Sequence, residues 1–296
     1  MRSLRIFLLA ASVMTLAVFS TTACNYRSAM TNLVTASAAE TAEATASETA
    51  AQDEQQGAEF RWRGAVAAGR VVEIKGVNGG VRAEGTAAGG EVEVVATKRG
   101  RRSAPESVRV EVVPHADGVT ICAVYPSPDP SKPNTCEPGA GGRSNVRDND
   151  VHVDFVVRVP AGVRFHGQTV NGGVEADGIA ANVEARTVNG EITVSTSGYA
   201  RASTVNGSIK ATMRSFDWDR SLEFSTINGG INLSFPDGLS ADVEAETLNG
   251  DISTDFQMTL QGRVSRRKLS AQIGGGGRRS LRLKTINGDI EIKRAS

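Results

Sequence analysis

Residues 186–211 read RTVNGEITVSTSGYARASTVNGSIKA, and the phrase T-V-N-G occurs in them twice, 17 positions apart. A Thr, an aliphatic residue, Asn and Gly recur in this order along the chain, and a looser copy, G-V-N-G, precedes them. The Asn residues of these copies are Asn78, Asn171, Asn189, Asn206, Asn228, Asn249 and Asn287. From Asn171 onward the steps are 18, 17, 22, 21 and 38 residues, and the last is close to two steps of 19 with one Asn-Gly missing. A period near 20 residues indicates a repeat architecture.

Apolar residues flank each Asn at fixed offsets, six and four positions before it and three and five positions after it. Around Asn189 these residues are Val183, Ala185, Ile192 and Val194. Polar residues alternate with them, which predicts strands that bury one face. The period of two excludes helix in this region.

The Asn-Gly pair is compatible with two folds, because it favours positive φ both in a tight hairpin turn and at the corner of a solenoid. We favour the solenoid. A meander needs only good turns, whereas the stacking of equivalent positions explains why the same Thr, aliphatic residue and Asn recur in each copy. The predicted fold is an all-β, single-stranded β-solenoid (β-helix) with rungs of about 17–22 residues, in which the Asn-Gly corners form a structural ladder. An antiparallel β-meander or barrel is the alternative.

The bulk composition argues against a nucleic-acid partner. The chain has 33 basic and 33 acidic side chains among 296 residues, and 5% of its residues are aromatic. It therefore has neither the positive charge nor the stacking side chains of a nucleic-acid-binding protein, and we predict no nucleic-acid partner.

The N-terminus is predicted to be a signal peptide covering residues 1–23. Arg2 and Arg5 precede an apolar run of about 14 residues, which is too short for an ordinary membrane-spanning helix. The motif Thr22-Ala23-Cys24 resembles the lipobox of bacterial lipoproteins, in which the Cys receives a lipid, although Thr21 stands where that family usually has Leu. We expect Cys24 to be the lipid attachment site; ordinary signal-peptide cleavage with an incidental Cys24 is the alternative.

The rest of the chain divides by composition. Residues 24–59 are rich in Ala, Thr, Ser and Glu and have little to bury, so we predict a disordered tether. Residues 60–296 are assigned to the solenoid domain, with an irregular insertion at about 98–150 where the repeat is interrupted.

The repeats resemble those of the bacterial envelope β-helix domains catalogued as "putative adhesins". The matching text is TVNGEITV, TLNGDIST and TINGDIEI, and the resemblance extends over about 60–296. It implies a β-helix fold and an adhesin-like binding role at the cell envelope.

The insertion contains Cys122 and Cys136. In an exported protein they are the natural disulfide pair, which leaves Cys24 for the lipid. A bridge that closes a loop of about 15 residues would contribute about 3 kcal/mol.

Residues that could act in catalysis or bind a cofactor are scattered along the chain. The positions after the Asn-Gly pairs form no continuous acidic ladder, since they are Gly80, Gly173, Glu191, Ser208, Gly230, Asp251 and Asp289. His115, His152 and His166 lie in no zinc-like or triad-like motif. We therefore predict no catalytic or cofactor-binding residues and no cofactor.

Two polar stretches in the insertion are interpreted as loops. Residues 148–150, Asp-Asn-Asp, match no calcium-loop spacing, so we predict no metal site. The basic stretch KRGRR at 98–102 has no interleaved aromatic residues, so a solvated turn is favoured over a ligand patch.

These patterns predict an exported, lipid-anchored, non-catalytic envelope module that is held to a membrane through Cys24 and faces the periplasm or the cell surface. Its candidate partners are an envelope glycan, another envelope protein or a host surface. The alternatives are a carbohydrate-active β-helix enzyme and a self-assembling structural solenoid. The charged C-terminal segment DIEIKRAS suggests a blunted solenoid end, which counts against assembly.

Overall fold

The computed structural model describes residues 52–56, 58–216, 218, 221–261, 265 and 267–295. The predicted signal peptide 1–23, Cys24 and most of the predicted tether 24–59 lie outside the described residues. The described residues belong to one compact unit, Glu48–Ser296. This unit consists of two sheets of 11 strands each, here called sheet A and sheet B.

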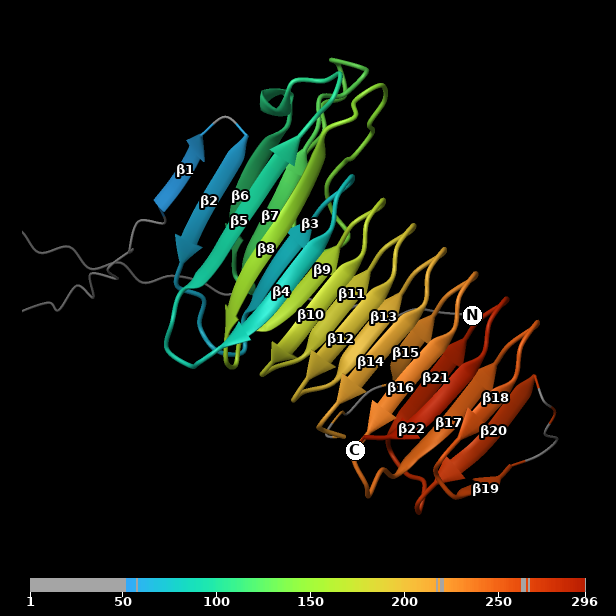
Figure 1. Ribbon diagram of the computed structural model, residues 1–296. Coiled ribbons are helices and arrows are strands. Elements are labelled where there is room, and N and C mark those ends of the chain that lie inside the picture. The colour runs from blue at the N-terminus through green and yellow to red at the C-terminus, as the bar shows by residue number, and fades with distance from the viewer. Residues whose placement is uncertain are drawn as a thin grey trace, which may run out of the picture. The chain divides into compact units, whose positions relative to one another are not determined.

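Both sheets run along the whole row of rungs (Figure 1). Sheet A contains, in spatial order, β1 (Gln52–Gln56), β2 (Glu59–Gly64), β5 (Val92–Arg99), β8 (His152–Pro160), β4 (Val81–Thr86), β10 (Val174–Ile179), β12 (Ile192–Thr196), β14 (Ile209–Met213), β16 (Ile231–Phe235), β22 (Ile290–Arg294) and β18 (Ile252–Thr254). Sheet B contains β19 (Met258–Leu260), β20 (Lys268–Ile273), β17 (Ala241–Glu246), β21 (Ser280–Lys284), β15 (Leu222–Ser225), β13 (Ala200–Ser203), β11 (Val183–Arg186), β9 (Arg164–Gln168), β3 (Val71–Lys75), β7 (Gly118–Val124) and β6 (Arg109–His115). A short 3₁₀ helix, η1, spans Pro105–Ser107.

Each central rung consists of a sheet B strand, an Asn-Gly corner and a sheet A strand. Neighbouring rungs pair in parallel, and equivalent residues face each other: Ile192 pairs with Ile209, and Ile209 with Ile231. Parallel, in-register stacking confirms the predicted β-solenoid and contradicts the antiparallel meander.

The core lies between the two sheets and is built from the predicted apolar positions. Val183, Ala185, Ile192 and Val194 are all buried, and the equivalent positions around Asn228 and Asn287 are filled by larger aliphatic and aromatic residues. Because each rung buries one face of two short strands, most of its apolar contacts are with the rungs above and below it.

The rungs do not stack in chain order. The corners follow one another as Asn78, Asn171, Asn189, Asn206, Asn228, Asn287 and Asn249, because each forms a β-bridge with the next. The C-terminal rung, β21–β22, therefore lies between the rungs β15–β16 and β17–β18.

This order corrects two sequence-based expectations. The 38-residue step from Asn249 to Asn287 does not hide a rung without Asn-Gly. It contains β18, then β19 and β20, which form an antiparallel end structure on β17, and then the return strand β21. The charged C-terminal strand β22 is internal to sheet A rather than an end, because β16 and β18 pair with its two edges.

The N-terminal end also closes with antiparallel strands. Sheet A ends in β8, β5, β2 and β1, each antiparallel to its neighbour, and sheet B ends in the antiparallel pair β7–β6. Strand β1 lies inside the segment 24–59 that was assigned to the tether, because backbone pairing with β2 needs no apolar side chain. Segment 98–150, expected as an irregular insertion, contributes the end of β5 and all of β6 and β7 to the sheets.

The sheet edges at β6, β18 and β19 are poor templates for another chain. Edge strand β6 contains Pro114, which cannot donate a backbone hydrogen bond, and edge strands β18 and β19 have three residues each. Short or proline-containing edges disfavour strand addition at β6, β18 and β19, whereas β1, the other edge of sheet A, has five residues and no proline. No helix among the described residues is long and apolar enough to cross a membrane.

Candidate functional site

The seven predicted corner asparagines form one continuous ladder of side-chain hydrogen bonds. Each Nδ2 donates to the Oδ1 of the next Asn at 2.7–2.8 Å, along the order Asn249, Asn287, Asn228, Asn206, Asn189, Asn171 and Asn78. All six bonds point the same way along the solenoid, so every corner is tied to its neighbours by side chain as well as by backbone.

A second ladder explains the threonine of the repeat. Each corner threonine is buried, and its hydroxyl donates to the glycine carbonyl of the adjacent corner. The pairs are Thr169 with Gly79, Thr187 with Gly172, Thr204 with Gly190, Thr226 with Gly207, Thr285 with Gly229 and Thr247 with Gly288, at 2.8–3.1 Å. A buried acceptor left unpaired would cost about 1–3 kcal/mol, so this position requires a hydroxyl.

The glycine of the repeat is required by close approach of the corners. A Cβ on Gly207 would lie 2.0 Å from the carbonyl oxygen of Gly190, and Gly207 has a φ of 154°. No side chain fits at that distance, and only glycine adopts that backbone conformation easily.

The aliphatic residue of the repeat, between the Thr and the Asn, faces outward. Val188, Ile227 and Leu248 are 38%, 42% and 57% exposed, although a polar side chain could occupy the same position. Equivalent residues of adjacent corners are neighbours, so these side chains form a continuous row, here called the corner stripe. Its members, in spatial order, are Val77, Val170, Val188, Val205, Ile227, Ile286 and Leu248. Val188, Ile227 and Leu248 are exposed, whereas the other four are half-buried and Val77 packs against the core.

The predicted pair Cys122 and Cys136 is joined by a disulfide. The bridge fastens the long segment that follows β7 to the outer face of sheet B. Beside it, Lys75, the register partner of Cys122, donates from Nζ to the carbonyls of Glu137 and Gly139 at 2.6 Å and of Gly141 at 3.1 Å. The ammonium group and the disulfide together fix this part of the loop.

The two ends of the same loop are also tied down. Asn134 donates to the carbonyls of Tyr125 and Asn145, both at 2.9 Å, and accepts from the Asn145 N–H at 2.7 Å. The Tyr125 hydroxyl donates to the Val151 carbonyl at 2.8 Å. Burial raises the pKa of Tyr125 to about 12, so this bond persists at physiological pH.

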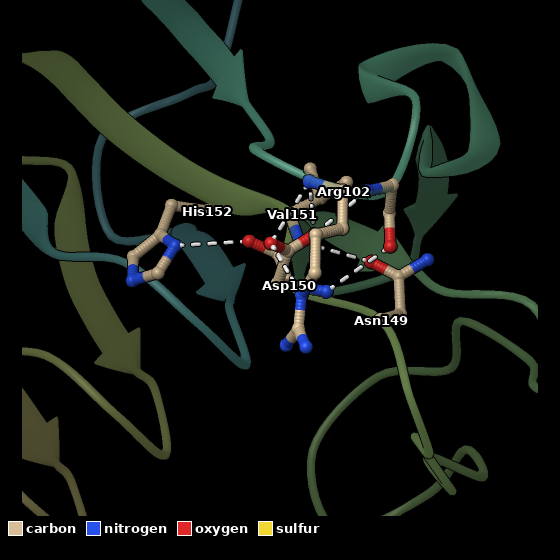
Figure 2. Close-up of polar contacts among 6 residues, drawn as sticks. Arg102, Asn149, Asp150, Val151 and His152 are labelled. Atoms are coloured by element: carbon tan, nitrogen blue, oxygen red, sulfur yellow. Dashed lines mark hydrogen bonds and ion pairs between the residues drawn. The ribbon is translucent and has the colours of Figure 1, made fainter.

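Arg102, in the basic stretch 98–102, lies beside Asp150, which precedes β8 (Figure 2). Asp150 accepts from the backbone N–H groups of Ser103, at 2.8 Å, and of Arg102, at 3.1 Å. The bond from Ser103 makes the largest contribution to lowering the pKa of Asp150, to about 2. Asn149 accepts from the Val151 N–H at 3.0 Å, and His152 Nδ1 lies 3.2 Å from the Asp150 carbonyl oxygen.

Most cations of this stretch have structural partners. Lys98 is buried and donates to the Val108 carbonyl at 3.3 Å, and burial lowers its pKa. Arg99 pairs with Asp154, and Arg102 lies 3.6 Å from Asp150. These contacts hold the end loops together and leave little free positive charge.

The histidines do not converge on one site. His166 lies between Glu73 and Glu184 in the register of sheet B, and its pKa is lowered by burial, which outweighs the two carboxylates. Glu73 accepts from the Thr120 hydroxyl at 2.7 Å and from the Gly139 N–H at 3.0 Å, so its carboxylate holds the loop. The part of the chain that the structure describes contains no cluster of three or more His, Cys, Asp or Glu suited to a metal ion.

Sequence reasoning missed the loop contacts of Glu73 and Lys75, because both are single polar residues on an otherwise regular strand. It also missed the hydrogen-bonding role of the residue after each Asn-Gly. Cys24, the predicted lipid site, lies outside the described residues.

Comparison with known proteins identifies one matching family. A family model described as Toastrack DUF4097 matches residues 146–293, half of the 296-residue chain, and spans every Asn-Gly corner except Asn78. A solved structure described as a putative cell adhesion protein from Clostridium sporogenes matches 82% of this chain and 100% of its own, at 11% identity and a TM-score of 0.39. One described as a putative adhesin from Bacteroides fragilis matches 80% of this chain and 97% of its own, at 11% identity and a TM-score of 0.25. No curated protein matches the chain.

Removal of the disulfide by the double substitution Cys122→Ser and Cys136→Ser should lower the free energy of unfolding by about 3 kcal/mol, because the bridge closes a loop of about 15 residues. Denaturant unfolding measures the loss, and limited proteolysis should cut first between residues 126 and 150. The substitution Lys75→Met in the disulfide-intact chain should also loosen the loop, with a smaller loss of stability. An unfolding midpoint and a cleavage pattern that the double substitution leaves unchanged would contradict the assigned role of the bridge.

Proposed function

This chain belongs to the Toastrack DUF4097 family, and from that membership and the geometry of its corners we propose that it is an exported, lipid-anchored, non-catalytic module that binds another component of the bacterial envelope. The observation that carries the proposal is the corner stripe. Two hydrogen-bond ladders hold a row of aliphatic side chains at the surface, where Leu248 is 57% exposed and Ile227 is 42% exposed. Contiguous exposed apolar rows on a soluble domain mark interaction surfaces.

The disulfide supports export. Cysteine pairs persist in oxidising compartments and are rare in reducing cytosol, so the Cys122–Cys136 bridge indicates a location outside the cytoplasm. The predicted signal peptide 1–23 agrees with this location.

Anchoring through Cys24 is the more specific part of the proposal. The predicted tether, which begins at Cys24, would hold the solenoid near a membrane while leaving its faces accessible. Globomycin should make a lipid-modified precursor accumulate in producing cells, and Cys24→Ala should move the protein from the membrane fraction to the soluble fraction. No accumulation and unchanged fractionation would show that Cys24 is not the anchor.

The two alternatives have less support. A carbohydrate-active enzyme needs paired carboxylates or a base aimed at an open site, and two candidate carboxylates, Glu73 and Asp150, are occupied with backbone donors of loops. A self-assembling solenoid needs open sheet edges, whereas β6 contains Pro114 and β18 and β19 are three residues long, which leaves β1 as the one edge strand without either feature among the described residues.

Binding of the labelled, purified chain to isolated envelopes of the producing cells tests the proposed function. We expect saturable binding, and Leu248→Asp should weaken it by about tenfold, because the new carboxylate would have to be desolvated without a partner in an apolar contact. Leu260→Asp is the matched control, since Leu260 is also 57% exposed but lies on β19, outside the corner stripe. Equal effects of the two substitutions would contradict a role for the stripe, and new reducing ends released from the envelopes would favour the enzyme.

A further inference from the structure

The residue after each Asn-Gly has a backbone N–H that is not satisfied by the strand ladder. Where this N–H has a partner, the acceptor is a side chain of the preceding rung. Asp154 Oδ1 accepts from Gly80 N at 2.9 Å, Ser208 Oγ from Gly230 N at 3.3 Å, and Asp289 Oδ1 from Asp251 N at 2.8 Å. In these three rungs a carboxylate or hydroxyl oxygen therefore caps the next rung. Among the described residues, the Glu191 carboxylate makes no such bond to the N–H of Ser208.

Two neighbouring rungs lack this cap. Gly80 and Gly173 occupy the position in adjacent rungs, so neither has a side chain to offer to the rung that follows. A Cβ built on Gly173 would lie 4.0 Å from Glu191 N, which shows that a side chain there would reach this N–H. Within the described residues, the N–H groups of Gly173 and Glu191 have no acceptor, and they are adjacent donors about 4.8 Å apart.

The missing side chains leave a hollow of about 560 Å³ on the outer face of sheet A, here called the glycine hollow. It lies over β8, β4, β10 and β12, which are side by side in Figure 1. Gly80 and Gly173 form its floor. Its walls are formed by Arg82, Arg99, Asp154, Val156, Glu175, Glu191 and Thr193.

The charges around the glycine hollow are largely paired. Arg99 is bound to Asp154, and Arg82 lies 3.3 Å from Glu84 and 3.2 Å from Glu175. The unpaired polar groups among the described residues are the two N–H donors, the Glu191 carboxylate and the Thr193 hydroxyl. Both arginines are already neutralised, which disfavours a simple anion, and two of the three carboxylates, Asp154 and Glu175, are paired with them, which disfavours a cation-selective site.

The remaining groups match the chemistry of a sugar. Each sugar hydroxyl can accept one hydrogen bond and donate another, so it needs the mixture of free donors and free acceptors found here. Val156, the register partner of Arg82, is 43% exposed beside the hollow and offers an apolar surface for the C–H groups of a sugar ring.

We propose that the glycine hollow binds a neutral sugar unit of an envelope oligosaccharide. The N–H groups of Gly173 and Glu191 donate to two sugar oxygens, and the Glu191 carboxylate accepts from a sugar hydroxyl. Val156 packs against the ring. This inference rests on the proposed function as an envelope-binding module and specifies its ligand class.

Calorimetric titration of the purified chain with tetramers of N-acetylglucosamine, cellotetraose and maltotetraose tests the proposal. At least one of these probes should bind saturably. Gly80→Ser should weaken that binding by about tenfold or more, because the hydroxyl would accept from the Gly173 N–H, as Ser208 does for Gly230, and would fill the hollow. The substitution is sterically mild, since the nearest atom to a Cβ on Gly80 is 3.7 Å away.

Gly230→Ser is the matched control, because Gly230 holds the same place in a rung outside the glycine hollow, and it should leave affinity unchanged. Glu191→Ala, an exposed substitution, should weaken binding independently of any backbone effect. Thermal unfolding checks that each variant is folded. The proposal is overturned if no oligosaccharide binds, if Gly80→Ser binds as tightly as the parent chain, or if acetate and phosphate bind where sugars do not. Envelope binding that depends on Leu248 while no sugar binds would remove the sugar site and leave the proposed function intact.

Discussion

Neighbouring corners approach each other so closely that the backbone of one forms the surface against which the next is built. A Cβ on Gly190 would lie 2.1 Å from the Gly172 carbonyl oxygen, so no other residue fits there without moving a rung. That approach brings each glycine carbonyl within reach of a buried threonine hydroxyl, and it brings the asparagine amides within 2.7–2.8 Å of one another. The Gly, Thr and Asn of the repeat thus all follow from the close approach of neighbouring corners. A single rung could not pay the entropic cost of ordering its backbone, of order 1–2 kcal/mol per residue, and stacking supplies the missing contacts.

The fold could be predicted from the sequence because the alternation of apolar residues and the repeated corner residues are local patterns. Period-two burial around Asn189 and Asn228 predicts the strands, and identity at the corners predicts stacking; the family match confirms the resemblance to envelope β-helix domains. The order of the rungs could not be predicted, because the corners at Asn249 and Asn287 are chemically alike and either could follow Asn228. In the structure, β17 pairs with β20 on one edge and with β21 on the other, so neither edge is left for β15, and β21 takes that place instead.

The candidate surface was harder to predict than the fold, for a physical reason. The sequence shows that Gly80 and Gly173 lack side chains, but it does not show which N–H groups are left without acceptors, since this depends on the rung that lies next in space. Lys75 and Glu73 likewise acquire their roles only when the loop after β7 returns across sheet B. The disulfide was predictable because the sequence has three cysteines, and the predicted lipid site Cys24 leaves Cys122 and Cys136 as the pair.

The corner has two different surfaces. The residues before each Asn form the corner stripe, which is apolar. The residues after each Asn-Gly form a polar row that is interrupted at the glycine hollow and again at Gly230. The same hydrogen-bond ladders hold both surfaces in place. Little conformational entropy of this chain would therefore be lost when a partner binds. Rigidity of this kind suits a binding module.

Engineered cross-linking measures the stacking of the corners most directly. Corners in adjacent rungs lie about 4.8 Å apart, within the Cα separation that a disulfide spans, whereas corners two rungs apart lie at roughly twice that distance. The account predicts that Asn228→Cys combined with Asn287→Cys forms a disulfide under mild oxidation, detected by mass spectrometry of proteolytic fragments. Asn228→Cys combined with Asn249→Cys should not. The reverse result, a link between 228 and 249 with none between 228 and 287, would mean that the rungs stack in chain order and would contradict the structure described here.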